Sequence, residues 1–133
     1  MKTVITYKEI SDFVEKQYKI RPMLNTVDLQ TVEVSYKPGT FIPAIVIKLR
    51  IDEVIDDVVH LSYECGKGAS FVITGAVAYL EQKIPKGIEV NTADKRIAVY
   101  LQQIKELEKA MKYVALNKVS FEDNSINLAL MII

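Results

Sequence analysis

Apolar and polar positions first separate in a helical pattern near the start of the chain. Apolar side chains recur there at intervals of three and four residues, as they do along one stripe of an α-helix. Thr6 and Glu9 have the spacing of a capping box, with Ile5 and Ile10 at the positions of a hydrophobic staple. Because the residue before Pro22 avoids helical geometry, the helix should end there. The sequence therefore predicts a helix between Thr6 and Arg21 whose apolar stripe is Ile10, Phe13, Val14 and Tyr18.

The next segment, Val27–Tyr36, alternates apolar and polar residues as a strand does, but the alternation slips by one position. Val27 and Leu29 share one parity, whereas the apolar residues from Val32 onwards share the other. One extra residue near Gln30–Thr31 would bring both groups to the same face. The pattern therefore predicts a single strand with a β-bulge at that point.

A second segment, Val114–Phe121, slips in the same way at an amide residue, Asn117. Both segments follow an amphipathic stretch, and both lead into a turn and an apolar strand. The similarity suggests two helix–strand–strand units within one domain.

Regular alternation predicts most of the remaining chain to be antiparallel strands joined by hairpins. A helix near Gln103–Lys112 is predicted from apolar residues on one side and lysines on the other, the lysines forming its solvated face. The expected strands are Ile45–Asp52, Val59–Tyr63, Ile88–Val90, Ile97–Leu101, Val114–Phe121 and Ile126–Ile133, and the lysines are Lys105, Lys109 and Lys112.

One segment, Phe71–Leu80, is apolar on nearly every side. Its length favours a helix, although the β-branched residues at its start and Gly75 weaken the helical preference. We expect a central helix that is buried on most of its circumference. Together these elements predict a single α+β domain, residues 1–133, in which a curved antiparallel sheet of about seven strands packs on two or three helices.

Composition narrows the class of protein. Half of the 133 residues are hydrophobic, which excludes a disordered chain. Seventeen Lys and Arg balance seventeen Asp and Glu, so the basic excess of a nucleic-acid-binding protein is missing. No uncharged run approaches the roughly twenty residues of a membrane span, and no signal peptide is visible. With one cysteine, Cys65, and therefore no internal disulfide, we expect a cytoplasmic protein.

The residues that catalysis would need are dispersed. His60, the single histidine, and Cys65 lie five residues apart on a predicted strand, roughly 16 Å along the chain and on opposite faces. The acidic residues from Asp52 to Asp57 lack the order of a calcium-binding loop and suit a solvated hairpin tip. We therefore expect no enzyme, no cofactor and no metal site.

The order of elements resembles the tubular lipid-binding superfamily, which includes bactericidal/permeability-increasing-like domains. The resemblance rests on a helix, a meander of long strands, an apolar helix and a closing hairpin. Its best-matching stretches are Thr6–Phe13 and Val119–Ile126. In that superfamily a highly curved antiparallel sheet wraps a long helix, and lipid lies in the cleft between them. The resemblance thus implies a lipid or other apolar ligand.

Two functions follow as hypotheses. The first is a non-enzymatic domain that holds an apolar small molecule or lipid between the sheet and the central helix. The second is a structural or adaptor protein that forms a homodimer through its C-terminal strand, which is apolar on both faces. The residues expected near the ligand are Phe13, Tyr18, Phe71, Val72, Tyr79 and Leu80, and those expected at the dimer interface are Met131 and Ile133.

Overall fold

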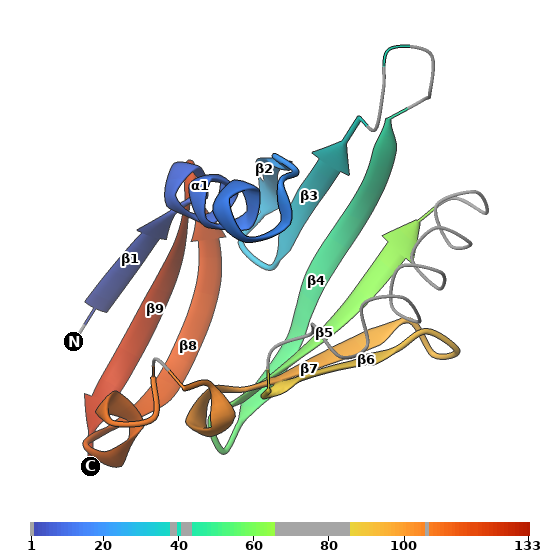
Figure 1. Ribbon diagram of the computed structural model, residues 1–133. Coiled ribbons are helices and arrows are strands. Elements are labelled where there is room, and N and C mark those ends of the chain that lie inside the picture. The colour runs from blue at the N-terminus through green and yellow to red at the C-terminus, as the bar shows by residue number, and fades with distance from the viewer. Residues whose placement is uncertain (1, 38–39, 41–43, 66–85, 106) are drawn as a thin grey trace.

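A computed structural model describes residues 2–37, 40, 44–65, 86–105 and 107–133. In these residues the chain forms nine strands in two antiparallel sheets, one α-helix and two short 3-10 turns, as Figure 1 shows. The predicted α+β class with antiparallel strands is confirmed. The described residues form one α-helix where two or three were predicted, and nine strands in two sheets where one sheet of about seven strands was predicted. The predicted Phe71–Leu80 helix lies outside the described residues.

The smaller sheet joins the two ends of the chain. Its order is β1 (Lys2–Thr6), β9 (Ser125–Ile132) and β8 (Val114–Glu122). The larger sheet has six strands in the order β2 (Met23–Asp28), β3 (Thr31–Tyr36), β4 (Ile45–Ile55), β5 (Val58–Cys65), β7 (Arg96–Tyr100) and β6 (Ile88–Asn91). The hairpins predicted for β4–β5, β6–β7 and β8–β9 are confirmed, whereas β1 was not predicted.

The first helix, α1 (Tyr7–Tyr18), begins as the sequence predicts. The Thr6 hydroxyl accepts a bond from the Glu9 N–H, and the Glu9 carboxylate accepts one from the Thr6 N–H, each at 3.1 Å. The predicted apolar stripe is only partly buried. Ile10 packs against the core, but Phe13 is 58% exposed.

The predicted single strand over Val27–Tyr36 is wrong. The chain reverses at Leu29–Gln30, and two strands, β2 and β3, replace it. The two-residue turn pairs Asp28 with Thr31, and a register shift between Thr26 and Asp28 then pairs Thr26 with Val32. The alternation along the sequence is therefore interrupted by a chain reversal with an irregularity beside it, and not by a bulge within one continuous strand.

The predicted helix over Gln103–Lys112 is also wrong. The described part of this segment contains two 3-10 turns, η1 (Leu101–Gln103) and η2 (Ala110–Lys112). Its ends are held by tertiary contacts, because the Leu101 N–H donates to the Asp57 carbonyl and Met111 is buried. These contacts override a weak local helical preference.

The core lies between the two sheets and is closed at one end by α1, as Figure 1 shows. Each layer contributes buried side chains, so the sheets share one core. These residues are Tyr7 from α1, Val32, Ile51 and Val59 from the larger sheet, and Leu116 and Phe121 from the smaller one.

A buried carboxylate ties the two sheets together. Asp57, in the β4–β5 turn, is 8% exposed and has a φ of 64°. Its Oδ1 accepts from the Leu116 N–H of β8 at 2.7 Å, and its Oδ2 accepts from Gln102 Nε2 at 3.0 Å. Asp and Asn adopt such a positive φ more readily than most residues, which suits an aspartate here.

Candidate functional site

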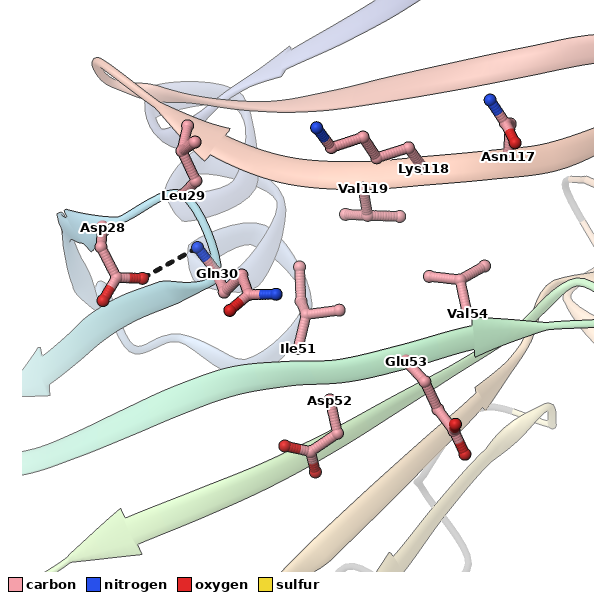
Figure 2. Close-up of a pocket in the computed structure, with 10 residues that line it drawn as sticks. All are labelled: Asp28, Leu29, Gln30, Ile51, Asp52, Glu53, Val54, Asn117, Lys118 and Val119. Atoms are coloured by element: carbon pink, nitrogen blue, oxygen red, sulfur yellow. Dashed lines mark hydrogen bonds between the residues drawn. The ribbon is translucent and has the colours of Figure 1, made fainter.

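An open pocket of about 530 Å³ lies where the two sheets meet (Figure 2). Three elements line it: the β2–β3 turn, the middle of β4 and the middle of β8. The volume falls within the range of small-molecule sites. The lining residues are Asp28, Leu29, Gln30, Ile51, Asp52, Glu53, Val54, Asn117, Lys118 and Val119.

The facing walls of this pocket are apolar. In Figure 2, Ile51 and Val54 point from β4 toward β8, and Val119 points from β8 toward β4. The charged neighbours leave the same strands in other directions, with Asp52 and Glu53 pointing away from β8. The charged groups therefore lie at the rim, and the interior between the strands is apolar.

Two β-bulges shape these walls. The ladder register shifts at Asp52 in β4 and at Asn117 in β8. Because of the extra residue, two apolar side chains three positions apart lie on the same face of the strand. In β4 these are Ile51 and Val54, and in β8 they are Leu116 and Val119. Without the bulges, alternation would turn one member of each pair away from the pocket.

The free edge of β8 borders the pocket between two anchoring hydrogen bonds. At one end the Phe121 N–H donates to the Leu29 carbonyl at 2.9 Å, and at the other the Leu116 N–H donates to Asp57. Backbone groups along an antiparallel strand point alternately toward and away from the paired strand. Val119, two residues before Phe121, therefore directs its N–H and C=O away from β9 and toward the pocket.

The carboxylates at the rim have local partners. Asp28 accepts from the Gln30 N–H at 2.8 Å, and this bond, with a further one from Thr31, lowers the pKa of Asp28. Asp52 accepts from the Ser62 hydroxyl at 3.1 Å. Within the described ranges no group of three His, Cys, Asp or Glu could hold a metal ion. Apolar walls with polar groups at the rim suit non-covalent binding.

Two of the ligand residues predicted from the sequence, Phe13 and Tyr18, lie away from this pocket. Phe13 and Tyr18 are on α1, 58% and 36% exposed, and do not line the pocket. The other four predicted ligand residues, Phe71, Val72, Tyr79 and Leu80, lie outside the described residues. His60 and Cys65 both belong to β5, where ladder alternation places them on opposite faces as predicted.

The predicted dimer residues occupy the end of a central strand. β9 pairs with β8 as far as Ile132 but with β1 only from Ser125 to Ala129. Met131 and Ile133 are 49% and 72% exposed. A partner at this end of β9 would therefore meet two exposed apolar side chains.

Sequence reasoning did not identify the pocket, although one signal was present. The alternation of Leu49 and Ile51 resumes out of step at Val54, and this slip marks the bulge at Asp52. No local pattern in the sequence indicates that two bulges and a turn from distant segments meet at one place.

No protein-family model, curated protein or solved structure matches this chain in the comparisons made. The resemblance to the tubular lipid-binding superfamily therefore stays a prediction. Across the described part of the chain, none of the helices has the length and apolar character needed to span a membrane.

Proposed function

We propose that this protein is a non-enzymatic binding domain that holds an apolar group in the pocket between its two sheets. The observation that carries the proposal is the pair of facing walls, Ile51 and Val54 on β4 and Val119 on β8. The pocket is open to solvent at its rim, where Leu29 is 54% exposed. An exposed leucine beside an apolar wall favours a ligand with an apolar part.

The proposal keeps the class of ligand expected from the sequence and changes its place. The sequence predicted a site between the sheet and a helix over Phe71–Leu80, whereas the pocket lies between β4 and β8. Both sites would use the same physical effect, since removing apolar surface from water contributes about 25 cal/mol per Å².

Binding of Nile red, a neutral apolar dye, tests the proposal, with native mass spectrometry to detect co-purified ligands. We expect dye fluorescence to rise on binding and Val54→Thr to weaken binding several-fold, because the hydroxyl adds a polar group to the wall at nearly constant shape. Val46→Thr is the matched control, because Val46 lies on the opposite face of the same strand and is 41% exposed.

Two results would count against this function. One is the absence of both dye binding and any co-purified small molecule. The other is an equal loss of binding in Val54→Thr and Val46→Thr, which would place the dye elsewhere. Thermal unfolding of both variants shows whether each remains folded.

A second candidate function, a structural protein that pairs with another copy of itself, is favoured by the exposed end of β9. Ile132 is 79% exposed, and its neighbours Met131 and Ile133 are also exposed. Tyr113, 70% exposed, lies beside them because the Ile133 N–H donates to its carbonyl. Burial of such a group of apolar side chains would favour association.

Sedimentation analysis over a range of concentrations tests this second function. We expect a dimer that Met131→Lys or Ile133→Lys dissociates, because each substitution places a charge in the apolar contact. Val46→Lys, an exposed valine on the other sheet, should leave association unchanged. A monomer at high micromolar concentration would contradict the hypothesis.

A further inference from the structure

The pocket offers a ligand more than an apolar surface, because a strand edge forms part of its wall. By ladder alternation the backbone N–H and C=O of Val119 point into it. These two groups are the donor and acceptor that one residue of a neighbouring antiparallel strand would use. A ligand that offers a complementary N–H and C=O could pair with both.

We propose that the pocket binds an N-acyl amino-acid amide with an apolar side chain, an inference that rests on the binding function proposed above. In such a ligand the N–H of the residue donates to the Val119 carbonyl, and its carbonyl accepts from the Val119 N–H. Directly opposed residues in an antiparallel pair place their side chains on the same face. The ligand's side chain would therefore lie beside the Val119 side chain, against Ile51 and Val54.

The length of the free edge limits the ligand to a short one. Leu116 is bound to Asp57 and Phe121 is bound to Leu29, so both ends of the edge are occupied. At about 3.3 Å per residue, the edge between these anchors is about 16 Å long. A longer peptide strand paired with β8 would collide with the residues that bind Leu116 and Phe121. A single amino acid with an acyl group and an amide at its ends fits between them.

The charges at the rim favour an amide over a free carboxylic acid. Asp28, Asp52 and Glu53 line the pocket together with one cation, Lys118. Hydrogen bonding lowers the pKa of Asp28, so this carboxylate stays charged at neutral pH. A ligand carboxylate would be repelled by these groups, while a neutral amide would not.

Titration of the ¹⁵N-labelled protein with N-acetyl-L-leucine methylamide, followed by amide NMR spectra, tests the inference. We expect the Val119 amide signal to move most and the Val46 signal to stay in place. The matched probe is the ester analogue in which oxygen replaces the leucine N–H. It should bind about three- to tenfold more weakly, the value of one neutral hydrogen bond. Free N-acetyl-L-leucine should also bind more weakly than the amide.

The outcomes separate this inference from the function on which it rests. If Nile red binds at the Val54 wall but amide and ester bind equally, or the Val119 signal does not move, the inference is overturned and the binding function stands. If neither Nile red nor the amide binds, the binding function itself fails. Tighter binding of free N-acetyl-L-leucine would overturn the argument from charge.

Discussion

The two places where alternation slips in the sequence, Leu29–Gln30 and Asn117, have different structures. At the first the chain reverses, and at the second it continues through a bulge. At each slip, an aspartate side chain accepts a hydrogen bond from a backbone N–H. Asp28 accepts from Gln30, two residues away, whereas Asp57 accepts from Leu116, 59 residues away. The same slip in alternation can therefore mark either a turn or a bulge. The hydrogen bond that stabilises it can join residues that are close together or far apart in the sequence.

Both slips lie in the same pocket, which gives the comparison a consequence for function. Leu29, Gln30 and Asn117 all line it. Backbone hydrogen bonds that the two aspartates accept thus hold a turn at one end of the pocket and β8 at the other. Changes to the bulge, to Asp57 and to Asp28 should therefore lower the stability of the fold by successively smaller amounts.

Deletion of Asn117 should have the largest effect. Without the extra residue, either Leu116 or the segment from Val119 to Phe121 must turn its apolar side chains away from the core. Loss of even one buried leucine costs about 2–5 kcal/mol, so we expect the deletion to unfold much of the population in thermal or urea denaturation. Asn117→Ala keeps the number of residues, and its exposed side chain predicts a change within about 0.5 kcal/mol. Equal stability of the deletion and the wild type would show that the bulge is dispensable.

Asp57→Ala should have an intermediate effect. It leaves the Leu116 N–H without its acceptor, and an unsatisfied buried N–H costs about 1–3 kcal/mol. Asp56→Ala is a matched control, because Asp56 also has a positive φ, 52°, but is exposed. The difference between the two variants in urea denaturation separates the two hydrogen bonds that Asp57 accepts, from Leu116 and Gln102, from backbone strain. Similar losses of stability in both variants would show that these hydrogen bonds contribute little.

Asp28→Asn should have the smallest effect, and one that depends on pH. The pKa of Asp28 is lowered in the folded state, chiefly by the Gln30 N–H, so the carboxylate stabilises the fold above its unfolded pKa of about 3.9. This contribution is lost as the pH falls through the lower, folded value. The difference in Tm between wild type and Asp28→Asn should therefore be constant near neutral pH and vanish in acid. A difference independent of pH from 7 to 2 would contradict this assignment.

Local patterns predicted the elements whose determinants lie close together in the chain. The capping box of Thr6 and Glu9 and the hairpins β4–β5, β6–β7 and β8–β9 are examples. The predicted helix over Gln103–Lys112 is wrong because distant contacts decide the structure there. The segment after Leu101 is held by Asp57 and the buried Met111 rather than by helical periodicity.

The candidate site illustrates the same limit. The class of ligand, apolar, was predicted from the sequence and stays a proposal, but the pocket was not predicted. Its walls come from β4 and β8, more than sixty residues apart between Ile51 and Val119. The slip at Val54 could have indicated the bulge in β4, but not which strand faces it.

The sequence by itself determined the hairpins β4–β5, β6–β7 and β8–β9, the start of the first helix and the positions where alternation fails, because these depend on residues close together in the chain. Only the tertiary structure decided that one failure is a turn and the other a bulge. It also decided that β9 is a central strand and that both slips border one pocket. These features depend on contacts such as that between Asp57 and Leu116, which no local pattern contains because folding alone brings the two residues together.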